Sequence, residues 1–554
     1  MNCVSEASPF PGKSPPGTDL SGARHRLLVA LLPVLLLLGL GWESFGRFDG
    51  WGDETSYLTA AQVLADGKLG DFHPLDGRLL VPVIIYLFKL TGLKLYWAGA
   101  LAAFSLSAAA VWLIGAFWGR AGYWGIPFLS ACLLASCPLF AHYSSAIYPE
   151  PFAACFVVLT LVAHRSFTNS GLRAGLIVGL LIGAAVVLRQ NCIVVWPVLL
   201  LHTAWHAFRR RRFRPAILYG AGTVLGGGLI LAATTVFFAF WTHDPFYFVK
   251  ESGRVAQYVP YDRLDNGVRS AHESSLRILA AFAGRDFAFV GVLLPLAGLV
   301  SLFKGKCRLE AALGLSMLGY LAFGSVSLSK YIPPAPIERY LVPVVPFLAI
   351  CLAWQIHRAA AFLRDTQMLK WLPRGCLKFA GCLCVAVPLA ANLFFALLDG
   401  QLPFPVNSQL EMFRLAAGEG GQRVFITQQT SYFFRPLLSQ DLLQLLEPLD
   451  VARENAPILT RYGVPSPYGE RESEIRTTLP GRFKVMLTPR DARRWRVASQ
   501  NPVSVTSPRA RQSLLRRLID RVRGRKIEAY PFKAPIAFIQ VDRSYQHISR
   551  SAEE

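Results

Sequence analysis

Long apolar segments are the feature that most constrains how this chain can fold. Blocks such as LLVALLPVLLLLGLG, VGLLIGAAVVL and FAGCLCVAVPLAANLFFALL recur between residues 27 and 398. A helix needs about 20 mostly apolar residues to cross the hydrocarbon core of a bilayer. Hydrophobic residues make up 53% of the chain, more than an ordinary soluble domain carries. The sequence therefore predicts an all-α polytopic membrane domain over residues 26–398.

Eleven segments are predicted to span the membrane. Two basic residues, Arg24 and Arg26, precede the first segment as in a signal peptide. No small-residue cleavage site follows, which indicates an uncleaved anchor. RLLVPVIIYLFKLTG, residues 78–92, is too short for a span and is predicted to be an interfacial helix. The predicted spans are residues 26–44, 94–118, 122–141, 147–164, 173–188, 190–207, 215–241, 286–303, 308–328, 339–357 and 376–398.

The distribution of basic residues predicts the orientation. RRRRFR, residues 209–214, and the basic stretch of residues 358–378 belong on the cytoplasmic side. Residues 1–25, rich in Pro, Ser and Gly, then form a disordered cytoplasmic tail. An odd number of spans places residues 399–554 outside the cytoplasm. The membrane that the spans cross is predicted to be a bacterial inner or plasma membrane. The net charge of +22 suits an anionic membrane surface, and no nucleic-acid-binding motif accompanies it.

Residues 399–554 are polar, rich in Arg and free of any predicted span. Alternating apolar and polar residues predict strands at 422–434, 481–489 and 534–542. Residues 439–449 and 511–526 have the apolar spacing of helices. This pattern predicts a small extracytoplasmic α/β domain. It contains no Gly-rich nucleotide loop, which argues against a sugar-nucleotide donor bound there.

Ionisable residues gather at the predicted outer ends of the spans. Asp53 and Glu54 lie in the first outside loop, residues 45–93, next to Tyr57. Charged groups near a membrane are costly unless they are paired or functional. The sequence therefore predicts a polar site at the outer boundary of the bilayer. Later segments of the chain add further polar and charged residues to this site: His142, Glu150, Arg189, Lys330, Arg339 and Tyr340. The long outside loop, residues 242–285, is either a lid over this site or a packed connector.

Several of these residues carry a resemblance to a known superfamily. Asp53-Glu54-x-x-Tyr57 resembles the Asp-Glu-x-x-Tyr signature of GT-C membrane glycosyltransferases, such as protein O-mannosyltransferases and lipid A aminoarabinose transferases. SSAIYPEPFAACFVVLTL, LRQNCIVVWPVLLL and ERYLVPVVPFLAI resemble three further segments of that superfamily. The chain departs from the pattern at Glu150, where Asp is usual. The resemblance covers residues 26–398 and includes no motif of residues 399–554.

The resemblance implies transfer of a sugar from a polyprenyl-phosphate donor to an acceptor hydroxyl. Asp53 is the candidate general base for the acceptor proton. Glu54 and Glu150 are candidates to orient the acceptor, to assist Asp53 or to hold a divalent cation. The candidates for binding the lipid-linked substrate are Tyr57, Arg189, Arg339, Tyr340, His142 and Lys330. Arginine suits the lipid phosphate because its fork gives paired, charge-assisted hydrogen bonds.

Each candidate also has a structural interpretation. Asp53 and Glu54 are placed to cap a helix, and Glu150 to stabilise a helix N-terminus. Arg189 and Arg339 suit anchoring to lipid headgroups, Tyr57 suits an aromatic belt, and a structural role is favoured for His142. Two other functions remain open: a transporter or flippase for a lipid-linked or anionic substrate, and a non-enzymatic scaffold. A transporter predicts charged or broken helices at mid-membrane and two related halves.

Overall fold

The computed structural model describes most of the predicted membrane domain and seven short strands beyond it. The described ranges are residues 20–41, 53–67, 78–118, 125–167, 171–248, 271–288, 290–304, 307–325, 334, 338–365 and 374–399, with the strands between residues 424 and 550. Asp53 is described only as the first residue of its helix, and Lys330 lies outside the described residues. Residues 1–19 of the predicted tail and residues 249–270 of the predicted loop over residues 242–285 are also outside them. Residues 20–25, which were predicted to belong to the disordered tail, instead form the first turns of helix α1 (Leu20–Gly41).

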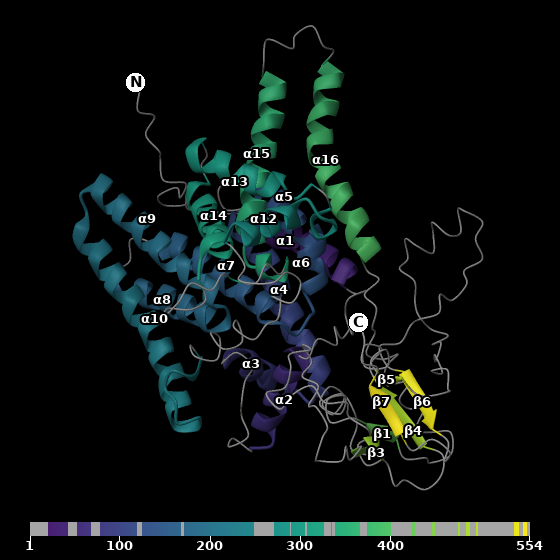
Figure 1. The fold of residues 1–554 in the computed structure, drawn as a ribbon. Coiled ribbons are helices and arrows are strands. Elements are labelled where there is room, and N and C mark those ends of the chain that lie inside the picture. Colours follow the sequence, from purple (N-terminus) through teal and green to yellow (C-terminus); the bar gives the residue numbers. More distant parts are fainter. Residues whose placement is uncertain are drawn as a thin grey trace, which may run out of the picture.

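Helices account for almost all of the described part of residues 20–399 (Figure 1). Each of the eleven predicted spans overlaps a helix of 12 residues or more, because each apolar block is bounded by Gly, Pro or charged residues. These helices are α1 (Leu20–Gly41), α4 (Leu95–Trp118), α5 (Gly125–Ser136), α7 (Pro149–Phe167), α8 (Leu172–Leu188), α9 (Val195–Arg210), α10 (Phe213–Trp241), α13 (Leu293–Lys304), α14 (Arg308–Phe323), α15 (Val345–Asp365) and α16 (Arg374–Asp399).

Four helical segments among the described residues are long and apolar enough to cross a membrane: Leu95–Ala116, Gln190–Arg210, Phe213–Trp241 and Val345–Phe362. Six shorter helices are also apolar. The chain therefore has the helices of a multi-pass membrane protein, while the number of eleven crossings stays a prediction. The helical character of residues 78–92 is confirmed by α3 (Leu80–Lys89). This helix buries Val81 and Ile85 and contacts α2 (Asp53–Ala65) and α4.

Three interruptions of the helices position the polar residues. The predicted span 122–141 ends as α5, and Pro138 begins the short helix α6 (Pro138–Tyr143), since Pro lacks the N–H that a continuing helix needs. Arg189 is extended, with φ −152° and ψ 115°, between α8 and the 3-10 helix η4 (Gln190–Val194). A third turn, η7 (Glu338–Leu341), precedes α15. The second and third interruptions carry Arg189 and Arg339.

Close backbone contact joins α8 and α10, which lie side by side in Figure 1. A Cβ atom added at Gly175 would lie 2.0 Å from the Tyr219 carbonyl oxygen, and one at Gly179 would lie 2.2 Å from the Thr223 oxygen. Small residues allow such an approach between membrane helices, where dispersion contacts replace the hydrophobic effect. The glycines of α8 and α10 therefore allow these two helices to pack closely.

The remaining short helices are α12 (Ala271–Phe282) and η6 (Arg285–Phe287), which lie between α10 and α13 in sequence. The strands form two sheets. One has the order β2-β1-β4-β6, built from β2 (Leu446–Pro448), β1 (Val424–Ile426), β4 (Phe483–Leu487) and β6 (Ala537–Val541). The other has the order β3-β7-β5, built from β3 (Ile475–Arg476), β7 (His547–Arg550) and β5 (Trp495–Arg496).

The C-terminal strands agree with part of the sequence prediction. β1, β4 and β6 fall inside the three segments predicted as strands; β1 pairs in parallel with β2 and β4, and β4 pairs antiparallel with β6. Residues 446–448, at the end of the predicted helix over 439–449, form β2 instead. The rest of both predicted helices lies outside the described residues. The α/β domain as a whole and the domain boundaries stay predictions.

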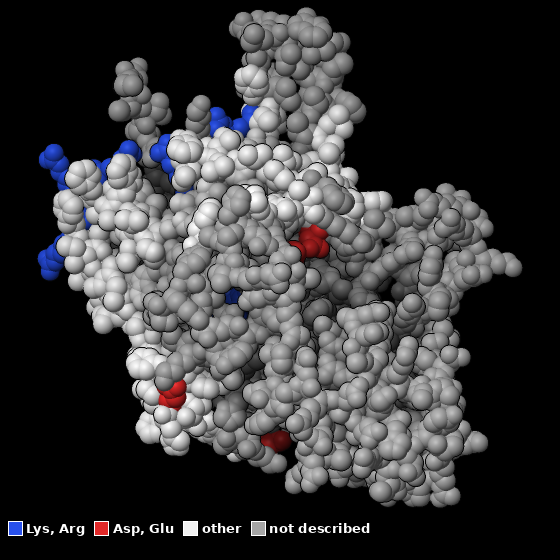
Figure 2. Space-filling model, in the orientation of Figure 1, with Lys and Arg blue, Asp and Glu red and all other residues white. Residues whose placement is uncertain are grey.

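Charged side chains separate along the helical domain. On the face shown in Figure 2, the described Lys and Arg side chains gather mainly at the end that holds the termini of α9, α14 and α15. This end includes the exposed residues Arg209 to Arg212 and Arg308. α2 and α3 lie toward the opposite end of the helices (Figure 1). The separation agrees with the predicted positive-inside orientation, which stays a prediction.

Candidate functional site

Glu150 is the centre of a buried ionic cluster at the start of α7. Its side chain is 0% exposed, and its Oε1 atom lies 3.1 Å from Nη2 of Arg189 and 3.7 Å from Nε of Arg339. The three residues come from α7, from the break between α8 and η4, and from η7. The structure therefore brings together three of the residues that the sequence predicted for one site. We refer to Glu150, Arg189 and Arg339 as the ionic cluster.

Tyrosine rings cover both guanidinium groups of the ionic cluster. The Arg189 guanidinium lies 3.6 Å from the centre of the Tyr340 ring. The Arg339 guanidinium lies 4.3 Å from the centre of the Tyr148 ring and 5.7 Å from that of Tyr340. A cation over an aromatic face is attracted by the ring quadrupole, more strongly where water is excluded. The rings thus hold two cations in place beside one carboxylate.

The Glu150 carboxylate has unused capacity to accept hydrogen bonds. Both of its oxygens are buried, and neither has a hydrogen-bond partner among the described residues, although Oε1 contacts both arginines. Buried carboxylate oxygens normally accept several hydrogen bonds.

Glu54 holds the segment that leads into α7. Its side chain is 1% exposed, and its Oε1 accepts a hydrogen bond of 3.0 Å from the Ile147 backbone N–H. Ile147 precedes Tyr148 and lies three residues before Glu150. The beginning of α2, where Asp53 also lies, therefore adjoins the beginning of α7, as the predicted site requires. The side chain of Asp53 itself lies outside the described residues.

Tyr57 is fully buried one turn along α2. Its hydroxyl accepts a hydrogen bond of 2.9 Å from Nη1 of Arg78. Arg78 did not appear among the predicted site residues, because in the sequence it is only the first residue of an apolar segment. Because Arg78 and Tyr57 are 21 residues apart, no local sequence pattern indicates that their side chains meet. The hydrogen bond ties α2 to the residues just before α3.

The other predicted site residues differ in their positions. Tyr340 stacks on Arg189 and belongs to the site. His142 is half-buried in α6, with its ring edge-on to Tyr143 at 4.8 Å between centres, and the Tyr143 ring in turn contacts Tyr148 at 5.8 Å. Lys330 lies outside the described residues. The described part of the chain contains no group of three or more His, Cys, Asp or Glu that could hold a metal ion, so the divalent cation stays an untested prediction.

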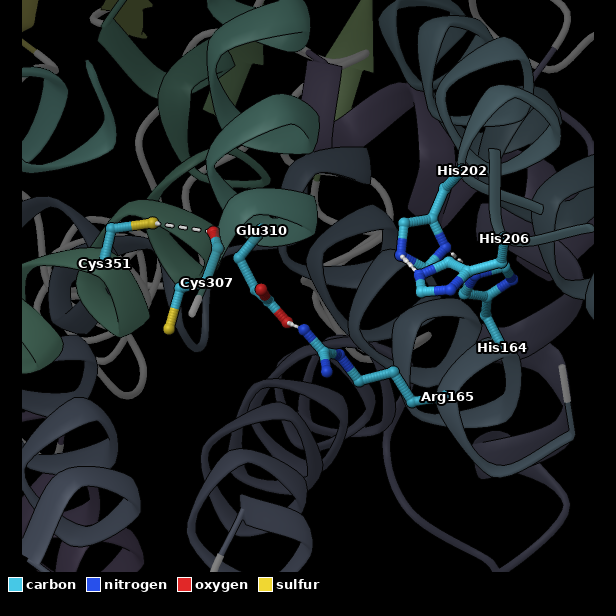
Figure 3. Close-up of polar contacts among 7 residues, drawn as sticks. All are labelled: His164, Arg165, His202, His206, Cys307, Glu310 and Cys351. Carbon is cyan, nitrogen blue, oxygen red and sulfur yellow. Dashed lines mark hydrogen bonds and ion pairs between the residues drawn. The ribbon is translucent and has the colours of Figure 1, made fainter. Parts of the chain in front are cut away.

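A second polar cluster lies at the C-terminal end of α7, where this helix meets α9 and α10 (Figure 3). His164 Nδ1 is 2.6 Å from the Tyr219 hydroxyl, and its Nε2 is 3.0 Å from Nδ1 of His202. His202 Nε2 lies 3.1 Å from Nε2 of His206. This cluster was not predicted from the sequence, although the four-residue spacing of His202 and His206 places them on one helix face.

A buried ion pair lies beside the histidines. Arg165 pairs with Glu310 of α14, whose side chain is 0% exposed. Figure 3 shows the Arg165 side chain directed toward α14 and away from the histidine rings. Hydrogen bonds and ion pairs between membrane helices hold the bundle together, so these groups join α7, α9, α10 and α14. No separate chemical role follows from these contacts.

The two clusters lie on opposite sides of the helical domain. Glu150 is in the first turn of α7, whereas His164 and Arg165 are in its last turn. α9 has 16 residues and is therefore about 24 Å long; it begins next to Arg189 and η4 and ends at Arg210. The ionic cluster thus faces the side opposite the RRRRFR run, which is the predicted outer side.

Comparisons with known proteins found similarity among solved structures only. No protein-family model and no curated protein matches the chain. The chain is similar to ArnT from Cupriavidus metallidurans bound to undecaprenyl phosphate, with 13% sequence identity, a TM-score of 0.48, and coverage of 85% of this chain and 96% of that chain. For the apo state of ArnT the identity is 14%, the TM-score is 0.44 and the coverage is 83% and 93%.

At these TM-scores the two structures decide nothing about the activity of this chain. Its own residues carry the functional argument.

Proposed function

We propose that the chain is a membrane glycosyltransferase that moves a sugar from a polyprenyl-phosphate donor to an acceptor hydroxyl outside the cytoplasm. The observation that carries this proposal is the ionic cluster: two arginines held by aromatic rings around a fully buried carboxylate. Its position at helix ends, on the side opposite the basic run, suits a donor whose phosphate lies at the bilayer surface while its tail stays in lipid.

The donor phosphate binds Arg189 and Arg339 in the proposed mechanism. Guanidinium groups bind phosphate oxygens through short, charge-assisted hydrogen bonds, and they stabilise the charge that the phosphate gains as it leaves. The bond from the anomeric carbon to the phosphate oxygen breaks, and a bond from that carbon to the acceptor oxygen forms. Asp53 takes the acceptor proton as general base. Glu54 positions the segment that carries Tyr148 and Glu150.

Activity in detergent separates this proposal from transport. A transporter needs two compartments, whereas sugar transfer does not. We therefore expect the purified protein in detergent to consume polyprenyl-phosphate sugars when it is given an acceptor-containing membrane extract. Mass spectrometry of the lipid fraction detects the free polyprenyl phosphate. A panel of hexose and pentose donors covers the sugars that the proposal allows, and consumption of none of them would contradict it.

The base assignment is tested by Asp53→Asn. This variant keeps the size of the side chain but removes its basicity, and we expect transfer to fall at least about 100-fold with expression and donor binding unchanged. Asp66→Asn is the matched control, because Asp66 is exposed at the end of α2 and its carboxylate accepts a hydrogen bond from Gln62. Undiminished transfer by Asp53→Asn would remove Asp53 from the mechanism.

A further inference from the structure

We infer that the side-chain amide of Asn191 donates a hydrogen bond to a phosphate oxygen of the lipid-linked donor. Asn191 belongs to η4 and lies two residues after Arg189. The proposed mechanism does not otherwise use it. The inference rests on the proposed function, which assigns the phosphate to Arg189 and Arg339, and it adds a neutral hydrogen-bond donor to these two cations.

The amide of Asn191 is buried, and only one end of it has a partner. The residue is 5% exposed, and Sγ of Cys192 donates a weak hydrogen bond of 3.7 Å to its Oδ1 atom. The Nδ2 atom has no hydrogen-bond partner among the described residues. Most buried polar groups are hydrogen-bonded, because an unpaired buried amide costs free energy in folding. The N–H donors of Asn191 therefore require an acceptor from outside the chain, either bound water or a ligand.

The position of Asn191 indicates which ligand supplies the acceptor. The Cys192 thiol that contacts the amide interacts electrostatically with both Arg189 and Glu150. The amide therefore lies beside the ionic cluster, in the short segment that follows the end of α8. Phosphate oxygens accept several hydrogen bonds at once. A phosphate on Arg189 thus provides the acceptor that the amide lacks.

A ligand-binding amide and a structural amide differ in how their loss affects the stability of the ligand-free protein. Leu has the same side-chain branching as Asn but no polar atom, so Asn191→Leu removes the cost of burying unpaired donors. We expect this variant, without ligand, to unfold at a temperature no lower than that of the wild type. An amide that is paired with a buried water predicts a lower unfolding temperature instead, because such waters are costly to remove.

Binding of a short-chain polyprenyl phosphate tests the inference without any transfer. The lipid is titrated into the purified protein in detergent, and we expect Asn191→Leu to lower its affinity about tenfold, since a hydrogen bond to a charged group is lost. Asn191→Ala adds no volume and should show the same loss, which covers the case in which Leu disturbs the fold. Asn392→Leu is the matched control, because Asn392 is also buried but its Nδ2 donates to Ser136 Oγ at 3.4 Å. The control should unfold at a lower temperature and bind the lipid normally.

The results for wild type and variants separate the role of Asn191 from the proposed function. Wild-type affinity in both Asn191→Leu and Asn191→Ala overturns the role of Asn191 and leaves the proposed function intact. The second ligand is the polyprenyl-phosphate sugar that the wild type consumes. Loss of affinity for this ligand alone would place the contact on the sugar and overturn the assignment to the phosphate. Binding of neither ligand to the wild type would overturn the proposed function itself.

Discussion

A hydrogen bond from the Ile147 backbone N–H to the Glu54 carboxylate connects the acidic motif of α2 to the residues that precede α7. The motif was recognisable in the sequence because ionisable residues at the ends of apolar segments are rare and costly. The same reasoning found Glu150, Arg189 and Arg339. It did not find that Tyr148 covers Arg339, or that Arg78 donates to Tyr57. Aromatic and arginine contacts of this kind depend on how helix ends meet in space, and no spacing in the sequence encodes them.

Substitutions of Glu54 separate a positioning role from a catalytic one. Gln keeps the oxygen that accepts the Ile147 N–H, so we expect Glu54→Gln to retain most of the transfer activity. Ala leaves this N–H without its partner, which costs about 1–3 kcal/mol and should lower both transfer and thermal stability. Transfer rates and unfolding temperatures in detergent measure the two effects. Equal loss of transfer in both variants, with stability unchanged, would instead assign the role to the charge of Glu54.

The helices themselves were the most predictable elements. Each apolar block of suitable length formed a helix, because its backbone groups have no other partners in a lipid environment. The interruption at Pro138 was missed, since the block from residue 122 to residue 141 reads as one continuous apolar run. The close contact of α8 and α10 was also missed. Glycine in an apolar segment does not by itself reveal which neighbouring backbone it approaches.

The contact between α8 and α10 predicts a marked difference between two glycines. Ala at Gly179 places a methyl group 2.2 Å from the Thr223 carbonyl oxygen, and the resulting overpacking should cost about 1–3 kcal/mol. Ala at Gly228 meets no atom within 4 Å and should leave stability unchanged or raise it, because Ala is the better helix former. Thermal unfolding of the two variants in detergent measures this, and equal unfolding temperatures would contradict the packing.

The molecule as a whole places its two polar clusters at opposite ends of α7. The basic end, seen in Figure 2, contains the exposed arginines and adjoins the histidines and the Arg165–Glu310 pair. The ionic cluster lies at the other end, where the Asp-Glu motif begins α2. The hydropathy and charge of the sequence predicted the separation of the basic end from the end with the acidic motif, because basic loops between apolar spans stay on the cytoplasmic side of a membrane. The chemistry of residues 399–554 did not emerge from either, because their sequence contains no motif that indicates an acceptor.

The central claim is that Arg189 and Arg339 hold a lipid phosphate, and the polyprenyl phosphate that copurifies with the protein tests it most directly. Extraction and mass spectrometry give the molar ratio of this lipid to protein. We expect a substantial ratio for the wild type and at least a tenfold lower ratio for Arg189→Ala combined with Arg339→Ala, since each lost charge-assisted contact costs about 1.5–3 kcal/mol. Equal ratios in two preparations of the same thermal stability would contradict the account.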